Sequence, residues 1–166
     1  MRFVAVPDTR PATGCGLNNA VRISRTSVAL SDPLTLSCPA AVSLALWERH
    51  VLQSAAQEHL DRAVTRIDHL GSYACRNVNG REVGPRSRHA TADAIDIAGF
   101  TLEGGRRVRA LGDWKGQADR DDATARFLRA SRDGACRFFD GVLSPDYNAA
   151  HADHLHFERH GTNVCR

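Results

Sequence analysis

Two short segments of the sequence gather residue types that bind metal ions. The first is SRHATADAIDI at residues 87–97, where Asp96 stands among small and apolar residues of an expected strand. A carboxylate buried in such a setting needs a partner, and a metal ion is one that satisfies it. His89, in the preceding loop, can fold back toward the same place. Taken alone, this pair does not favour a metal site over the simpler interpretation, in which the aspartate caps a helix or forms a salt bridge and the histidine lies on the surface.

The second segment is HADHLHF at residues 151–157. On a strand, His154 and His156 share one face, whereas Leu155 and Phe157 pack on the opposite side. Four histidines within ten residues favour a metal site over a polar surface tail. Zinc binds His nitrogen and Asp oxygen at ~2.0–2.2 Å, and catalytic sites keep three protein ligands and a water. One aspartate and two histidines would supply these three protein ligands.

A sheet and packed helices must position these segments, and we expect a single α+β domain over residues 1–166, with a small antiparallel sheet flanked by helices. Residues 1–14 are expected to be an irregular lead-in, and residues 77–88 a loop. The hydrophobic pattern predicts these further elements: one or two strands within 21–36, a helix from Ala40 to about Arg62, strands at 64–73 and 92–102, a tight turn at 103–105, a returning strand at 106–114, a helix that begins near the acidic residues 119–122 and ends near Phe139, a turn at 144–146, and a last strand at 155–158.

Cysteine content suggests an oxidising compartment. Without a CxxC pair, disulfides are a better interpretation than a zinc knuckle. Two bridges and one free thiol allow fifteen arrangements, and the sequence does not choose among them. We therefore expect an exported protein of the periplasm or cell envelope, although its first ten residues contain no apolar stretch of the signal-peptide type. The cysteines are Cys15, Cys38, Cys75, Cys136 and Cys165.

Charge and hydropathy exclude two classes of partner. The net charge is +3, the arginines are scattered and aromatic residues make up 6% of the chain. A nucleic-acid-binding protein would concentrate its basic residues beside stacking aromatics, so no nucleic-acid partner is expected. No apolar run approaches the length that spans a bilayer, so no stable membrane insertion is expected either.

Several ordered motifs together resemble a known family. The pattern S-x-H-x-x-x-x-A-x-D, followed far downstream by D-H-x-H, is similar to zinc peptidases of the D-Ala-D-Ala carboxypeptidase and LAS group. The chain resembles more closely still the bacterial extensin-like C-terminal domain, from about Cys15 to Cys165. The motifs that carry this resemblance are CG at 15–16, GSYACR at 71–76, SRHA at 87–90, AIDI at 94–97, LSP at 143–145 and HADHLH at 151–156.

The resemblance implies a LAS-type metallopeptidase fold and assigns His89, Asp96 and His156 as ligands of a Zn²⁺ ion. It places His154 beside the metal, where it would transfer a proton or hold the oxyanion. Asp153 is a second candidate for that role, because the carboxypeptidase branch has a glutamate three residues before the last ligand. Arg76 matches an arginine that contacts the substrate carbonyl as negative charge develops. The implied reaction is hydrolysis of peptide bonds in peptidoglycan stem peptides or cross-links.

One departure and two alternatives accompany this hypothesis. The family motif usually has glycine where this chain has Ala92, and a positive φ angle there would strain an alanine. Asp93 adds a charge that the motif does not require. The first alternative is a non-catalytic module that keeps the metal and binds cell wall or a protein. The second is a cysteine hydrolase that uses Cys75, which would need an exposed thiolate with a lowered pKa.

Overall fold

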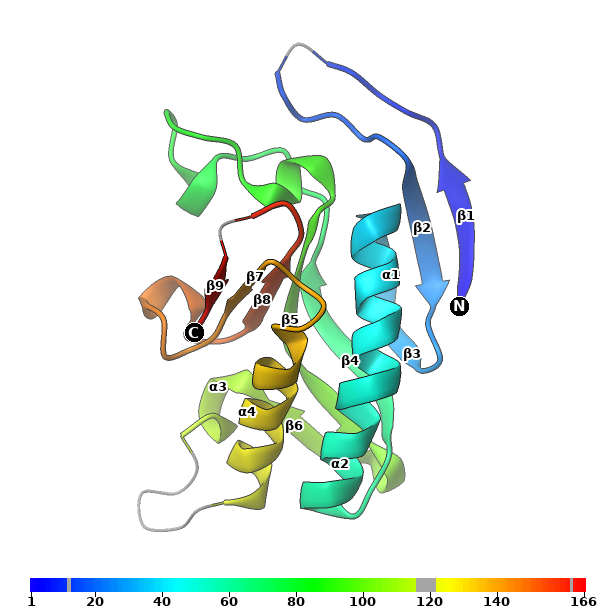
Figure 1. The fold of residues 1–166 in the computed structure, drawn as a ribbon, viewed down its shortest axis with the longest axis vertical. Coiled ribbons are helices and arrows are strands. Elements are labelled where there is room, and N and C mark those ends of the chain that lie inside the picture. Colours follow the sequence, from blue (N-terminus) through cyan, green and yellow to red (C-terminus); the bar gives the residue numbers. More distant parts are fainter. Residues whose placement is uncertain (12, 116–121, 162) are drawn as a thin grey trace.

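A mixed β-sheet is the framework of the protein, and helices α1 (Cys38–Trp47), α2 (Gln53–Leu60) and α4 (Ala123–Ala135) pack on one of its faces (Figure 1). The structure is a computed structural model that describes residues 1–11, 13–115, 122–161 and 163–166. Within these residues nine strands form one sheet in the order β1-β2-β3-β4-β5-β8-β7-β9, and β6 pairs with β5. The strands are β1 (Arg2–Val6), β2 (Ala20–Arg25), β3 (Ala29–Ser37), β4 (Val64–Gly71), β5 (Ala94–Leu102), β6 (Arg107–Arg109), β7 (Gly141–Leu143), β8 (Leu155–Glu158) and β9 (Val164–Cys165).

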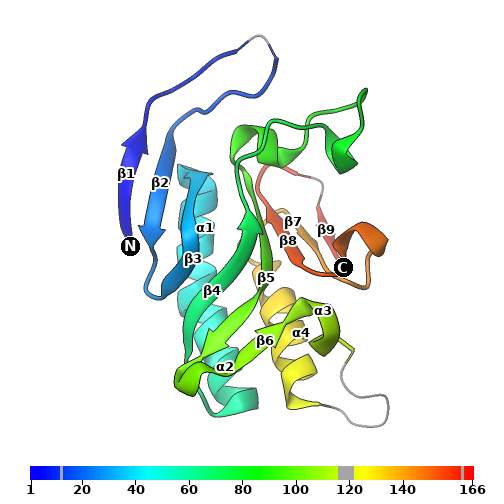
Figure 2. The ribbon, with the colours of Figure 1, turned by 180° about the vertical axis from the view of Figure 1, so that it is seen from behind.

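The helical segments are one long run, one amphipathic helix and several single turns. The long run and α4 lie side by side across the sheet, as the view from behind also shows (Figure 2). The segments are α1 (Cys38–Trp47), η1 (Glu48–Leu52), α2 (Gln53–Leu60), η2 (Val78–Gly80), η3 (Arg88–Thr91), η4 (Glu103–Gly105), α3 (Ala110–Asp113), α4 (Ala123–Ala135) and η5 (Ala149–His151).

The predicted helix from Ala40 to about Arg62 is confirmed as the continuous run α1-η1-α2. Ser37 caps its start, because the Ser37 hydroxyl accepts a hydrogen bond from the backbone N–H of Ala40 at 3.3 Å. The middle turn, η1, is a wider π turn that the apolar spacing does not reveal. The run ends at Asp61, whose φ of 50° is left-handed.

An aromatic cluster joins this helical run to the centre of the sheet. The ring centroid of Trp47 lies 5.1 Å from that of Phe157 and 6.2 Å from that of Phe100. Trp47 is fully buried, and its indole N–H donates to the Ser131 carbonyl of α4 at 2.9 Å. The rings of Phe100 and Phe127 meet edge to face at 5.3 Å. These contacts pack strands β5 and β8 against the helices.

The alternation of side chains on β5 and β8 separates a core face from a polar face. Ile95 and Ile97 of β5 and Leu155 and Phe157 of β8 belong to the hydrophobic core under the helices. The intervening residues therefore point to the opposite face of the sheet. The predicted faces of these two strands are confirmed, and the strand predicted at 155–158 has the predicted bounds as β8.

Several other expectations need correction. The sheet is neither small nor wholly antiparallel, because β3 pairs with β4 and β7 with β9 in parallel. The predicted irregular lead-in contains β1, which pairs antiparallel with β2. Strands β7 and β9 were not predicted at all.

The predicted returning strand over residues 106–114 is also too long. After β6 the chain turns away, because Gly112 adopts a φ of 98° and Trp114 inserts into the core. Asp113 stabilises the turn by accepting a hydrogen bond from the Arg109 N–H at 2.8 Å. Of the predicted acidic helix start, residues 119–121 lie outside the described residues, whereas Asp122 caps α4 through the N–H of Thr124 at 2.9 Å. That helix ends at Ala135, before the predicted end at Phe139.

Candidate metal centre

The pairing of β5 with β8 brings the two metal-binding segments together. Asp96 and His156 are direct partners in this antiparallel pair, on the face that the helices leave uncovered. Asp96 Oδ1 lies 2.8 Å from His156 Nδ1. Both residues are buried, with exposed fractions of 8% and 7%. The strand pairing therefore positions an aspartate and a histidine that are 60 residues apart in sequence.

His89 completes the group from the loop before β5. It lies on the short turn η3, which Ser87 caps and which ends at Ala92. Ala92 has a left-handed backbone with φ of 59°, so that the chain reverses between His89 and the start of β5. His89 Nε2 consequently lies 3.1 Å from Asp96 Oδ2 and 3.3 Å from His156 Nδ1. The sequence-based concern that position 92 needs a positive φ is confirmed.

The other nitrogen of each imidazole is engaged by an acceptor. His89 Nδ1 contacts the carbonyl oxygen of Ser72, and His156 Nε2 lies 2.9 Å from a carboxylate oxygen of Glu158. Because carbonyl and carboxylate oxygens only accept, these two nitrogens carry the protons. In the neutral rings the lone pairs are then on His89 Nε2 and His156 Nδ1, the two atoms that face each other.

The charges of this group shift its pKa values strongly. Burial raises the pKa of Asp96, but hydrogen bonds from His156 and His89 and their positive charges outweigh burial and hold that pKa well below its usual range. Burial lowers the pKa of His156, but hydrogen bonds to Asp96 and Glu158 outweigh it and raise that pKa to about 9. Without a metal ion, His156 is therefore a cation between two carboxylates.

His154, Asp153 and Arg76 lie around this group at different distances. His154 Nε2 is 3.5 Å from Asp96 Oδ1, and His154 Nδ1 is 2.7 Å from Asp153 Oδ1. Asp153 thus lies on the far side of the His154 ring, with 54% of its side chain exposed. The guanidinium of Arg76 is 3.8 Å from Asp96 Oδ2, and 41% of its side chain is exposed. The structure brings every sequence-predicted site residue to one place, with Asp153 at its edge.

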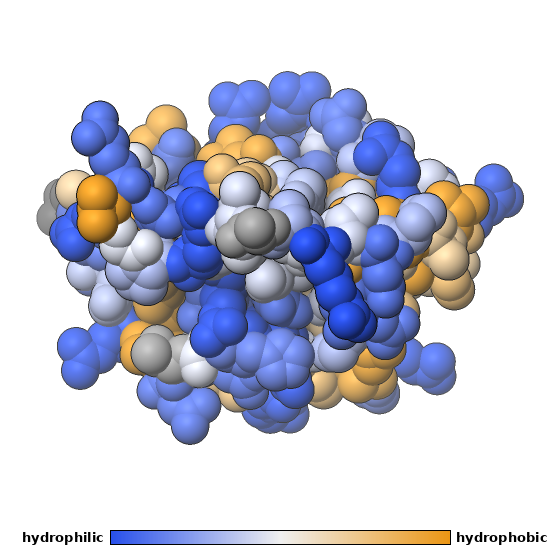
Figure 3. Space-filling view, turned by 90° about the horizontal axis from the view of Figure 1, so that it is seen from above, coloured by the Kyte–Doolittle hydropathy of each residue, from blue (hydrophilic) through white to orange (hydrophobic). Residues whose placement is uncertain are grey.

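An open groove of about 660 Å³ gives access to the group, within the ~300–1,000 Å³ typical of ligand pockets. His151 lines it, with its ring centroid 5.1 Å from His154 and 5.7 Å from His156. Burial, followed by the charges of those two histidines, lowers the pKa of His151 to about 4. The end of the molecule seen from above is mainly hydrophilic (Figure 3). Further lining residues are Arg76, Arg86, Arg88, Leu143, Tyr147 and Asn148.

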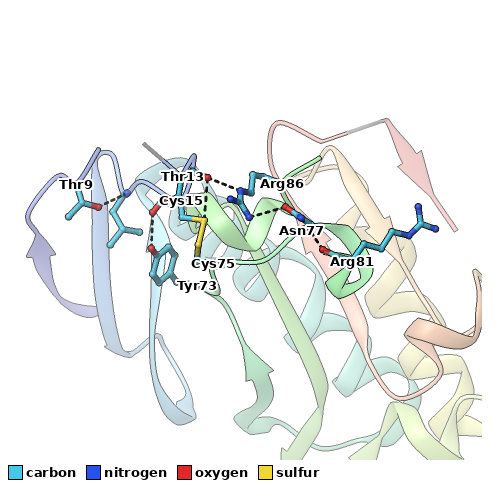
Figure 4. Close-up of a disulfide and its surroundings, with 9 residues drawn as sticks. Thr9, Thr13, Cys15, Tyr73, Cys75, Asn77, Arg81 and Arg86 are labelled. Atoms are coloured by element: carbon cyan, nitrogen blue, oxygen red, sulfur yellow. Dashed lines mark hydrogen bonds between the residues drawn. A yellow bond between two sulfur atoms is a disulfide. The ribbon is translucent and has the colours of Figure 1, made fainter. Parts of the chain in front are cut away.

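Two disulfides fix the surroundings of the site, Cys15–Cys75 and Cys136–Cys165, and Cys38 is the free thiol. Figure 4 shows Cys15–Cys75 tying the N-terminal segment to the loop that carries Arg76. The Tyr73 hydroxyl reinforces this link by donating to the Cys15 carbonyl at 2.8 Å. Because Cys75 is half of a disulfide, it offers no thiolate, and the cysteine-hydrolase alternative is wrong. Two disulfides are compatible with an exported protein.

The three central residues have the chemistry and spacing of a metal site. Within the described residues, His89, Asp96 and His156 form a group whose ligand atoms all lie within 4.8 Å of one another. Four tetrahedral ligands at ~2.1 Å from a zinc ion are roughly 3.4 Å apart. The separations of 2.8, 3.1 and 3.3 Å here are close to that value. The donor set, two imidazole nitrogens and a carboxylate, therefore fits such an ion.

Two contacts of this site were missed by sequence reasoning. Glu158 follows His156 by two residues, and the same strand alternation that placed His156 would have placed it on the metal-facing side. Ser72 contributes a backbone carbonyl, for which the side-chain sequence holds no signal. Asp93, noted in the sequence as an extra charge, is structural, because it accepts hydrogen bonds from Ser37 at 2.6 Å and Thr91 at 2.7 Å.

Fold and site together define an α+β protein with a buried His/Asp/His group suited to a metal ion. The chain belongs to the family described as Extensin-like protein C-terminus, whose model matches residues 1–166. Comparison with curated proteins and with solved structures finds no match. None of the helices in the described part of the chain combines the length and apolar character that crossing a membrane requires.

Proposed function

We propose that this protein is a zinc-dependent peptidase that hydrolyses peptide bonds in peptidoglycan stem peptides or cross-links. The observation that carries the proposal is the convergence of His89 Nε2, His156 Nδ1 and the Asp96 carboxylate, with the other imidazole nitrogens bonded to acceptors. Metal-binding histidines characteristically donate their second N–H in this way. Two imidazole lone pairs facing each other at 3.3 Å are mutually unfavourable unless a cation or a proton lies between them.

A zinc ion bound here would supply Lewis acidity, polarising a carbonyl and lowering the pKa of water to ~7. In our proposal His154 is the acid/base group. Its Nδ1–H is held by Asp153, which leaves the lone pair of Nε2 directed toward Asp96 and available to take a proton. Asp153 acts by orienting His154, because it contacts the opposite side of the ring. Arg76 stabilises negative charge that develops on the substrate carbonyl oxygen.

The peptidoglycan substrate rests on the resemblance to LAS-type peptidases, and three features of the chain support it. The groove is open and lined by both polar and apolar groups, so an extended peptide can enter it. Arg76 and Arg88 line it and complement the free carboxylates of cell-wall peptides. The two disulfides suit the periplasm or cell envelope, where that polymer is located. We also propose that the sheet and its helices have the fold of LAS-type metallopeptidases.

Mass spectrometry of cross-linked muropeptides tests the proposal directly. We expect cleavage by zinc-loaded protein and none after chelation or in His156→Ala. His50→Ala is the matched control, because His50 is exposed on η1, packs against Phe138 and does not line the groove. Cleavage by chelated protein would contradict the metal requirement. A folded, zinc-containing protein that cleaves nothing would instead favour a non-catalytic cell-wall-binding module.

A further inference from the structure

Glu158 is the acidic residue that lies behind His156 as seen from the candidate metal position. It follows His156 by two residues on β8, so both side chains emerge on the same face of the sheet. Its Oε2 lies 2.9 Å from His156 Nε2, whereas Asp96 contacts the opposite nitrogen, Nδ1. Glu158 therefore contacts the one ring nitrogen that cannot bind the ion held by His89 and Asp96.

Two glycines make the space that Glu158 occupies. A Cβ atom at Gly161 would lie 1.9 Å from Glu158 Oε1, and a Cβ at Gly141 would lie 2.6 Å from Glu158 Cγ. Any larger residue at either position would displace the Glu158 side chain. Only 17% of that side chain is exposed, so it has little freedom to move elsewhere. Gly141 on β7 and Gly161 after β8 thus leave a space that fits the Glu158 carboxylate.

We propose that Glu158 is a positioning residue for His156: it holds the proton on Nε2 and so presents the Nδ1 lone pair to the metal ion. The proposal rests on the zinc site proposed above. A free imidazole exchanges between two tautomers, and only the one protonated at Nε2 has its lone pair on the side of His89 and Asp96. The carboxylate also fixes the ring plane and increases the basicity of Nδ1.

The geometry argues against a more direct role. Glu158 cannot share the ion with His89 and Asp96, because the His156 ring lies between its carboxylate and that place. It contacts no other candidate ligand among the hydrogen bonds and ion pairs of the described residues. Its effect on a bound metal must therefore pass through His156.

Zinc affinity at a pH above the His156 pKa of about 9, where a proton no longer competes for Nδ1, tests the role without reference to activity. Competition with a fluorescent chelator measures it. We expect Glu158→Ala to bind zinc about 10–100-fold more weakly than wild type, the usual effect of losing such a partner. Glu158→Gln keeps an acceptor oxygen and should recover part of the affinity. Glu58→Ala, at an exposed position on α2, is the matched control and should bind like wild type.

A second variant displaces the Glu158 side chain without replacing that residue. Gly161→Ala should weaken zinc binding in the wild-type background, because the new methyl group displaces the carboxylate. In the Glu158→Ala background the same change should have no further effect, which makes a double-mutant cycle. Nitrogen NMR of the zinc-loaded protein should show His156 protonated at Nε2 in wild type and a weakened, exchanging signal in Glu158→Ala.

The outcomes separate the two proposals. Wild-type protein that binds no zinc would overturn the proposed function and this inference together. Tight wild-type binding with unchanged affinity in both Glu158→Ala and Gly161→Ala would overturn the inference alone. Equal losses from Glu158→Ala and Glu158→Gln, with no change in the His156 NMR signal, would also overturn it, because the carboxylate would then act through general packing.

Discussion

Zinc affinity should fall steeply as the pH is lowered from 8 to 6. The reason is competition for a single atom, His156 Nδ1, which a proton occupies in the metal-free protein and a metal ion would need. Hydrogen bonds to Asp96 and Glu158 outweigh burial and raise the pKa of His156 to about 9, so the metal-free ring is protonated throughout this range. Asp96 stays ionised, because its pKa is held well below its usual range.

The size of the effect follows from that pKa. Below about 9, each unit of pH lowers the unprotonated fraction of His156 tenfold, equivalent to ~1.4 kcal/mol. Apparent zinc affinity should therefore fall about a hundredfold between pH 8 and pH 6, or ~2.7 kcal/mol. Binding at pH 7 should release about one proton from this ring for each zinc ion.

Chelator competition at pH 6, 7 and 8 measures the slope. Isothermal titration calorimetry in buffers of different ionisation enthalpy counts the protons released. His50→Ala should show the wild-type slope, since it lies outside the site. An affinity that does not change with pH, or binding that releases no proton, would refute the assignment of His156 Nδ1 as the displaced group.

Three further predictions concern the framework and the acid/base pair. Replacing Cys15 and Cys75 by serine should lower the free energy of unfolding by about 4 kcal/mol, because the bond joins residues 60 apart; urea denaturation measures this, and an unchanged midpoint would contradict it. Asp153→Asn should lower kcat by up to the ~10²–10⁴-fold contribution of a general base, with zinc content and KM unchanged, since among the described residues its hydrogen bond and ion pair are with His154; loss of zinc would contradict it. Ala92→Gly should change stability by less than about 1 kcal/mol in the same urea assay.

Strand alternation allowed much of the site to be predicted. Asp96 and His156 each lie between apolar neighbours, so their faces follow from the period of two. The residues that the family resemblance assigned do converge. What the sequence could not supply was the register, because which residues of β5 and β8 face each other depends on the pairing of distant strands.

The features that sequence reasoning missed depend on tertiary context. Strands β7 and β9 have three and two residues, too short for a periodic pattern, and they exist through their pairing with neighbours. Strand β1 is exposed along most of its length, so burial leaves no alternation in its sequence. The disulfide pairing could not be predicted either, because it depends on which cysteines the tertiary fold brings together, and their spacing in the sequence does not determine this.

Ala92 shows how local strain and packing offset each other beside the site. A left-handed alanine costs about 1–2 kcal/mol, which glycine would relieve. Two effects of glycine would lower stability. The greater entropy of the unfolded chain would cost ~0.4–1 kcal/mol, and the loss of a buried methyl group would cost ~0.8 kcal/mol. That methyl group packs against Leu17 and Ala20, so its removal loses stabilising apolar contacts.

The opposing contributions at Ala92 nearly cancel, which is why Ala92→Gly should leave the unfolding free energy almost unchanged. Ala92→Val makes the matched test, because a β-branched residue is disfavoured at a φ of 59° and the position has no exposed surface to receive extra atoms. It should destabilise the protein by several kcal/mol. It should also weaken zinc binding, since the reversal at Ala92 is what directs His89 toward Asp96. A glycine variant stabilised by more than about 1.5 kcal/mol would show that the methyl group contributes little and that strain dominates at this turn.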